Sequence, residues 1–153
     1  MKQLLIVAHS PSVNMQALVA ALSEGAGDPE IDGVAVTVVE ALKVTPEQVL
    51  ACDGIMLFTS ENLGYMSGGL KDFFDRCYYP VLERKQGLPC ALVIRAGSDG
   101  TGTRRAIESI VTGLRWQWVQ EPLTCRGEWQ PEFLTQAREL GMGMAAGLSA
   151  GIF

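Results

Sequence analysis

One segment, residues 60–75, constrains the fold more than any other part of the chain. It reads S-E-N-L-G-Y-M-S-G-G-L-K-D-F-F-D and follows an apolar run at residues 54–58. Its second half opens a helix whose apolar side chains keep the i, i+3, i+4, i+7 spacing of one buried face: Leu70, Phe73, Phe74, Cys77, Tyr78 and Val81. A buried strand, a polar glycine-rich loop and a helix therefore follow one another directly. Because ligands of open parallel sheets bind where the strands end, this loop is the first candidate for a binding site.

The same alternation of strand and helix patterns runs along the whole chain. Apolar or β-branched runs predict strands at residues 3–8, 34–39, 54–58, 88–94 and, more weakly, 118–124. Helical patterns lie between them, and a last helix is predicted from Pro131 toward Gly147. Continuous apolar strands that alternate with helices are typical of a parallel sheet covered on both faces. The sequence therefore predicts one α/β domain, residues 1–153, a three-layer sandwich with a five-stranded parallel sheet in the order 2-1-3-4-5.

Charge and composition exclude several classes of protein. The net charge is −5, and the only arginine pair, Arg104 and Arg105, is interpreted as a solvated helix start, so no nucleic-acid partner is expected. No apolar run approaches the roughly 20 residues that cross a bilayer, and the apolar start is too short for a signal peptide, so a cytoplasmic protein without membrane insertion is expected. With a single histidine, His9, and isolated cysteines, no metal site is expected. The four thiols are predicted to be buried and reduced.

Three loops are predicted to meet at the carboxyl edge of this sheet. The first, residues 9–14, offers two serine hydroxyls, an amide and the free N–H groups of a helix start, which together form a phosphate cradle without fixed positive charge. It lacks the lysine of G-x-x-x-x-G-K-[ST] and the pattern G-x-G-x-x-G, so a phosphate monoester fits better than ATP or NAD. A capped turn without a ligand is the alternative for this loop taken alone.

The second and third loops, residues 59–69 and 96–102, are rich in glycine. Their backbones can approach a flat ligand closely, and their N–H and C=O groups can pair with a ring that carries both donors and acceptors. Each loop alone could be a flexible surface connection. Three such loops at successive positions of one edge favour a shared ligand site.

The chain resembles the flavodoxin-like flavoprotein superfamily, on the side of the NAD(P)H-dependent FMN and quinone reductases. The most specific part is residues 53–76, which follows the family segment T-P-x-x-x-G-x-M-S-G-x-hydrophobic-K-x-F-x-D, with Ser60 where proline is usual. The matching residues are Thr59, Gly64, Met66, Ser67, Gly68, Lys71, Phe73 and Asp75.

The resemblance implies FMN as the cofactor and assigns each loop a part of it. The phosphate turn corresponds to Ser10, Ser12, Val13, Asn14 and Met15. The ring contacts correspond to Thr59, Ser60, Glu61, Asn62, Leu63, Gly64 and Tyr65. The loop over the pyrimidine side of the ring corresponds to Ala96, Gly97, Ser98, Gly100 and Thr101. Val13 stands where glycine is frequent in the family, which is expected to weaken phosphate closure.

The expected function is that of an FMN-binding oxidoreductase that passes hydride from NAD(P)H to a quinone or a similar small acceptor. The flavin carries such a reaction, so no catalytic side-chain pair is expected. The third loop has no aromatic residue, and only Tyr65 is in reach, which leaves one ring face open to a nicotinamide. A flavodoxin-type electron carrier without direct NAD(P)H oxidation is the alternative, and a flavin-free scaffold is a further one. The chain is close to the minimal core of such reductases, so a homo-oligomer that completes the pocket is also considered.

A signalling receiver domain has the same strand order but is excluded by its chemistry. Receivers need an acidic cluster after the first strand and a phosphorylatable aspartate at the end of the third. His9 and Ser10 stand at the first place, and Thr59 and Ser60 at the second.

Overall fold

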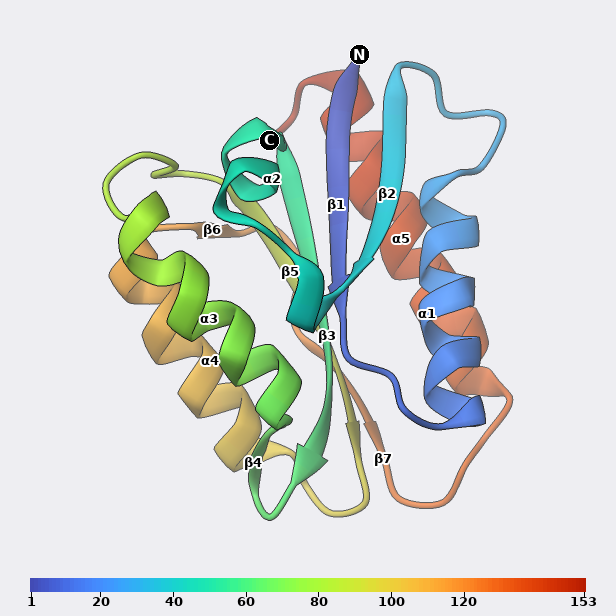
Figure 1. Ribbon diagram of the computed structural model, residues 1–153. Helices are drawn as coiled ribbons and strands as arrows, with labels where there is room; N and C mark the ends of the chain where they lie inside the picture. Colours follow the sequence, from blue (N-terminus) through green and yellow to red (C-terminus); the bar gives the residue numbers. More distant parts are fainter.

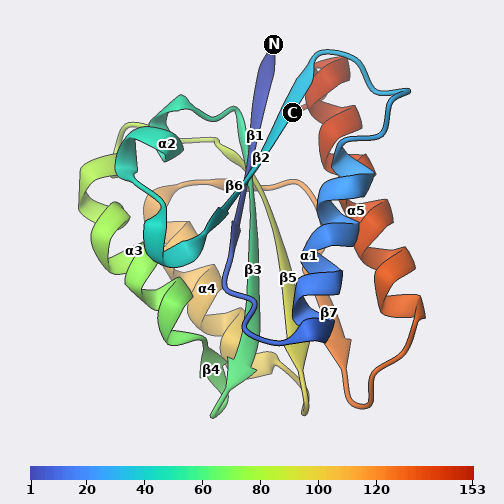
Figure 2. The same cartoon turned by 45° about the vertical axis from the view of Figure 1, so that its right-hand side comes forward.

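A twisted sheet lies between two layers of helices in the computed structural model, which describes all 153 residues (Figure 1). The strands are β1 (Lys2–Ala8), β2 (Val34–Glu40), β3 (Gly54–Asn62), β4 (Tyr65–Met66), β5 (Pro89–Ala96), β6 (Gln117–Trp118) and β7 (Leu123–Arg126). The helices are α1 (Val13–Ala26), α2 (Pro46–Ala51), α3 (Gly68–Val81), α4 (Thr101–Leu114) and α5 (Glu132–Ala150), with a short 3-10 turn at Ala41–Lys43. Figure 2 shows α1 and α5 on one face of the sheet and α2, α3 and α4 on the other.

The parallel α/β sheet is confirmed, but its strand count was wrong. The sheet has seven strands in the order β2-β1-β3-β5-β6, with β7 also paired to β5 and β4 paired to β3. Every pairing is parallel except that of β3 with β4. β5 occupies the place of the predicted fourth strand, and β6 and β7 share that of the fifth.

The two extra strands have separate local causes. The predicted third strand does not stop at Phe58 but continues to Asn62 and folds back as β4. The predicted fifth strand is interrupted at residues 119–122, Val-Gln-Glu-Pro, so that β6 and β7 pair with opposite ends of β5. Pro122 lacks an N–H group and cannot donate to β5, which is consistent with a break at this point.

Alternating side chains of each strand feed two separate cores. On β1, Leu4 and Ile6 belong to the core under α1 and α5, and Leu5 and Val7 to the core under α2, α3 and α4. Successive side chains of a strand point to opposite faces, so a strand that is apolar throughout must be covered on both sides. The sheet is therefore buried on both faces, as its continuous apolar runs predict.

Helices α1 and α5 cross at two glycines without room for larger residues. A Cβ atom on Gly25 would collide with the carbonyl oxygen of Arg138, and one on Gly141 would collide with that of Leu22. The backbones of α1 and α5 are therefore in direct contact on the face of the sheet that these two helices cover. This contact fixes α1, whose first residues form part of the site described below.

The four cysteines are buried and form no disulfide. Burial raises the pKa of the Cys52 and Cys125 thiols to about 11. No helix of the structure combines the length and the apolar character that crossing a membrane requires.

Candidate functional site

The structure brings the three glycine- and serine-rich loops to one edge of the sheet. Strands β1, β3 and β5 are parallel neighbours, with Ala8 opposite Phe58 and Ser60 opposite Arg95. The loops that follow these strands therefore leave the sheet from the same edge, the lower one in Figure 1. The three loops therefore lie at the carboxyl edge of the sheet, as the sequence predicted.

The first loop ends in a capped helix start with unused backbone donors. Ser12 is the N-cap of α1, and its Oγ accepts a hydrogen bond from the N–H group of Met15 at 3.2 Å. The N–H groups of Ser10, Ser12, Val13 and Asn14 have no acceptor within the protein. Ser12, Val13 and Asn14 are exposed, and Ser10 is half-buried. Free N–H groups and the positive end of the helix dipole can together hold an anion at this point.

His9 connects this first loop to the start of α3. The His9 imidazole lies against Gly69, where a Cβ atom would collide with the ring. The backbone N–H group of His9 donates to the carbonyl of Phe58 at 3.3 Å. The His9 Nδ1 atom is buried and has no hydrogen-bond partner in the protein. The structure therefore shows a packed histidine that has one unsatisfied ring nitrogen beside the three loops.

The second loop is a tight β-hairpin and not the open loop that its glycines predicted. Leu63 and Gly64 form its turn with φ angles of 53° and 75°. A two-residue turn with both φ angles positive matches the twist of the strands that it joins. Asn62, Leu63, Gly64 and Tyr65 are exposed, and Glu61 is half-buried.

Buried hydroxyl groups hold the base of this hairpin. Thr59 Oγ1 accepts a hydrogen bond from the Ser67 N–H group and donates to the Ser60 carbonyl, both at 2.9 Å. Ser60 Oγ bonds Asn62 Oδ1 at 2.9 Å, and Ser67 Oγ caps α3 by accepting from the Leu70 N–H group. The side chains of Thr59 and Ser60 are buried and bonded within the protein, so their hydroxyls serve the turn into α3.

The tip of the hairpin rests on the first turn of α4. A Cβ atom on Gly102 would collide with the Gly64 carbonyl oxygen. Two steps earlier, Gly100 is the N-cap of α4 with a φ of 72°, and a Cβ atom there would meet Thr124 Cγ2 at 2.8 Å. Gly102 is required by close backbone packing, which places the second and third loops in direct contact, and Gly100 is required by its left-handed φ angle.

The third loop is anchored from β7. Arg126 Nε donates to the Asp99 carbonyl at 2.8 Å, and the Gly127 N–H group donates to the Ala96 carbonyl at 2.9 Å. The Asp99 carboxylate accepts from the Thr101 N–H group at 3.0 Å, and this bond lowers its pKa. Ala96 and Gly100 are buried. The exposed residues of this loop are Gly97, Ser98, Asp99, Thr101 and Gly102.

Arg95 supports this loop from beneath and was not singled out from the sequence. Its Nη1 atom donates to the carbonyls of Ala96 and Cys125 at 2.9 and 3.0 Å. Its guanidinium also stacks over the rings of Phe133 and Trp129, with its central carbon 5.3 and 5.9 Å from their centres. Apart from Ala96, the partners of Arg95 lie 30 or more residues later along the chain, so no local pattern marks them.

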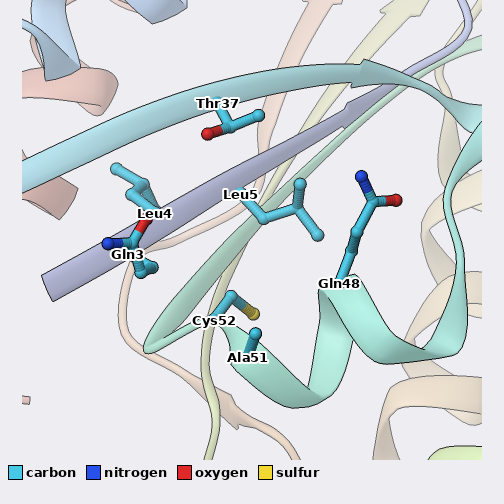
Figure 3. A pocket seen from close by; sticks show the side chains of 7 residues that line it. All are labelled: Gln3, Leu4, Leu5, Thr37, Gln48, Ala51 and Cys52. Atoms are coloured by element: carbon cyan, nitrogen blue, oxygen red, sulfur yellow. The ribbon is translucent and has the colours of Figure 1, made fainter.

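No cavity of the structure is enclosed by the three loops. None of the cavities is lined by the first loop or the hairpin, and one of about 300 Å³ includes Gly100 and Thr101. Another, of about 230 Å³, lies between β1, β2 and α2 and includes Leu5, Gln48 and Cys52 (Figure 3). No group of three or more His, Cys, Asp or Glu side chains is placed to hold a metal. A ligand between the three loops would therefore lie on an open rim.

The residues at this rim fit a phosphate attached to a flat heteroaromatic ring such as FMN. The first loop supplies four free N–H donors, and the Nδ1 atom of its residue His9 is buried without a hydrogen-bond partner. A Cβ atom built on Gly68 or Gly97 would meet nothing within 4 Å, so both backbones are open to close approach by a ring. Tyr65 is 40% exposed and is the one aromatic side chain on these loops.

Comparison with known proteins reveals similarity of structure and not of sequence. No family model and no curated protein matches the chain. A flavodoxin from the domain Archaea superimposes with a TM-score of 0.79 at 18% identity, with 98% of this chain and 99% of that chain covered. The WrbA-like flavodoxin of Agrobacterium tumefaciens gives 0.76 at 16% identity and 99% coverage of both chains.

The two-electron reduced flavodoxin of Megasphaera elsdenii gives a TM-score of 0.75 at 16% identity, over 93% of this chain and 98% of that one. Identities this low carry the fold and not the residues of a site. All three relatives are matched over nearly their whole length, which agrees with one undivided sheet and its five helices. The chain therefore has the flavodoxin-like fold.

Proposed function

We propose that the protein binds FMN at the rim formed by the three loops. The phosphate lies on the first loop, and the ring lies beside the hairpin and the third loop. The observation that carries this proposal is the set of free N–H groups on Ser10, Ser12, Val13 and Asn14, at the end of β1 and the start of α1. Three proteins of the same fold are named flavodoxins, one of them in a two-electron reduced state, which supports a redox role.

With FMN bound, we propose that the protein is an oxidoreductase that passes electrons from NAD(P)H to a quinone or a similar small acceptor. Bound FMN would supply the hydride-transfer chemistry, and the chain binds and orients it. The third loop presents only small side chains to the ring, from Gly97 to Thr101. One ring face then remains free for a nicotinamide.

A flavodoxin-type electron carrier is the second candidate. Its support is that this chain of 153 residues covers three flavodoxins almost completely. The exposed Tyr65 would be able to stack on one face of the ring in either case. The two functions differ in whether NAD(P)H reduces the bound cofactor directly.

The first experiment removes one of the free N–H groups. Val13 is the first residue of α1, and Ser12 before it has the extended backbone, φ −108° and ψ 160°, that a following proline requires. Val13→Pro therefore deletes a donor without interrupting the helix, and Val13→Ala is the matched control that keeps it. Since a hydrogen bond to a charged group contributes about 1.5–3 kcal/mol, Val13→Pro is expected to weaken FMN binding roughly ten-fold or more.

The readout is quenching of FMN fluorescence on titration, with riboflavin as the ligand that lacks the phosphate. Circular dichroism and the melting temperature of the apoprotein report whether α1 is intact. The proposal is wrong if FMN does not bind the wild-type chain. It is also wrong if Val13→Pro and Val13→Ala have the same affinity for FMN and the same affinity for riboflavin.

A second experiment separates the reductase from the carrier. The FMN-loaded protein is mixed with NADH or NADPH without oxygen, and the visible absorbance of the cofactor is followed. Bleaching by either nucleotide, reversed on adding a quinone, is expected for the reductase. A cofactor that stays oxidised with both nucleotides and is reduced only by dithionite supports the carrier.

Two further properties belong to the same proposal. The four unpaired thiols support a reducing compartment such as the cytoplasm. A homo-oligomer would cover the open rim from a second subunit, and sedimentation velocity on the FMN-loaded protein measures it.

A further inference from the structure

A polar cavity of about 300 Å³ opens at the start of α4, on the β7 side of the third loop. It has no hydrophobic lining residue, and three arginines surround it. The lining residues are Asp99, Gly100, Thr101, Arg104, Arg105, Glu108, Thr124 and Arg126. Three guanidinium groups around one hollow are unusual for a chain with a net charge of −5.

The carboxylates of the cavity are already bonded. Glu108 lies 3.4 Å from Arg104 Nε, and Arg104 also bonds Glu121 at 2.9 Å. Asp99 accepts from the Thr101 N–H group at 3.0 Å. These contacts neutralise Arg104. Besides the Thr101 bond, the charge of Arg126 also lowers the Asp99 pKa, but neither Arg105 nor Arg126 forms an ion pair with a carboxylate.

Arg105 and Arg126 keep their charge available. Neither takes part in an ion pair of the structure, and both are exposed. Arg126 uses Nε to hold the Asp99 carbonyl, which fixes its guanidinium and leaves the two terminal nitrogens free. A planar guanidinium with two free N–H donors matches the oxygens of a phosphate.

We infer that this cavity binds a phosphate group of the nucleotide that reduces the protein. The inference rests on the proposed reductase function for the identity of the ligand. Gly100 and Thr101 line the cavity and also belong to the loop predicted to cover the ring, so the two sites share one wall. A nicotinamide stacked on the ring would have its phosphates within reach of this wall.

Either of two phosphate groups has the required chemistry. The pyrophosphate is common to NADH and NADPH, and the 2′-phosphate is present only in NADPH. ADP carries the first kind of group and 2′,5′-ADP carries the second, so these two probes distinguish the source. Inorganic phosphate tests for a site that holds any anion.

The experiment is isothermal titration of the protein, with FMN added and without it, with ADP, 2′,5′-ADP and inorganic phosphate. Arg105→Ala removes a guanidinium that makes no bond within the protein, and Arg105→Glu reverses the charge. The matched control is Arg84→Ala, an exposed arginine after the far end of α3. Amide NMR shifts of Thr101 report binding independently of any turnover.

At least one nucleotide is expected to bind more tightly than inorganic phosphate and to weaken with rising salt. Its affinity is expected to fall about ten-fold in Arg105→Ala, and further in Arg105→Glu, with no change in Arg84→Ala. Tighter binding of 2′,5′-ADP assigns the 2′-phosphate, and tighter binding of ADP assigns the pyrophosphate.

The inference is overturned if no nucleotide binds, if Arg105→Ala binds as tightly as the wild type, or if inorganic phosphate binds as tightly as either nucleotide. FMN titration of the same samples keeps the two proposals apart. Nucleotide binding that depends on Arg105 in a protein without affinity for FMN would support the phosphate site and refute the flavin function.

Discussion

The contact between α1 and α5 gives the sharpest test of the fold. Replacing Gly141 with alanine places a Cβ atom against the carbonyl oxygen of Leu22 and 2.9 Å from the backbone nitrogen of Ala26. Both are backbone atoms of a helix, so they cannot rotate away as a side chain would. The two helices must therefore separate, and the core between them and the sheet loses contacts.

The expected loss of stability follows from two opposing effects. Overpacking of a close contact costs about 1–3 kcal/mol, and more when backbone must move, whereas alanine is a better helix former than glycine by about 1 kcal/mol. Because the atoms in collision belong to backbone, the upper end of about 3 kcal/mol applies, and a net loss of about 2 kcal/mol is expected for Gly141→Ala. For a domain of this size each kcal/mol lowers the melting temperature by about 2–4 °C, so a fall of roughly 4–8 °C is expected.

The assay is thermal and urea unfolding followed by circular dichroism. Gly143→Ala is the matched control on the same helix, because its Cβ atom would meet only the end of the flexible Gln120 side chain, at 2.9 Å. This control is expected to be neutral or to gain up to about 1 kcal/mol from helix propensity. A Gly141→Ala protein as stable as Gly143→Ala would refute the reasoning from close backbone contact.

Three further outcomes are expected. Thr59→Val leaves the buried Ser67 N–H group without its acceptor and should lower the free energy of unfolding in urea by about 1–3 kcal/mol. Thr59→Ser keeps the hydroxyl and should keep most of the wild-type stability. Equal losses in the two variants would contradict the role of the Thr59 hydroxyl as that acceptor. Burial raises the pKa of Cys52 and Cys125 to about 11 in the folded state, so the unfolded chain loses these two protons at a lower pH. The free energy of unfolding should therefore fall between about pH 9 and pH 11. A variant with alanine at both positions should show a shallower fall when melting temperatures are measured over this pH range. Arg95→Met should destabilise the protein by about 1.5–3 kcal/mol. It should also accelerate hydrogen exchange at Gly127, because the Gly127 N–H group and Arg95 both donate to the Ala96 carbonyl. Unchanged exchange at Gly127 would show that Arg95 does not hold the third loop.

The architecture could be predicted because it depends on patterns that are local in the sequence. Continuous apolar runs require a sheet covered on both faces, and the helical spacing between them supplies the covers. The start of α2 is local in the same way, since Thr45, Pro46 and Gln48 lie within four residues and form a full capping box. The strand-end position of the three loops then follows from the parallel direction of the strands.

The details of the site depend on contacts that no local pattern encodes. The hairpin turn at Leu63 and Gly64 lacks the Asn-Gly or Asp-Gly pair that usually marks one, so its glycine was interpreted as part of an open loop. Its position is set by Gly102, nearly 40 residues later. Arg126 meets the third loop only after β7 has paired with β5. The cavity between Arg105 and Arg126 was missed for the same reason, since the sequence shows only an arginine pair at a helix start.

The break at residues 119–122 has a consequence for how the protein avoids aggregation. An uninterrupted outer strand offers a row of free N–H and C=O groups on which another chain can add a strand. Here that border is divided into two pieces of two and four residues, and Pro122 stands between them. The opposite border, β2, is seven residues long, rich in valine and unpaired on its outer side. Fibril-like growth or strand exchange between copies of this chain is therefore expected to begin at β2 and to find no template at β6 and β7.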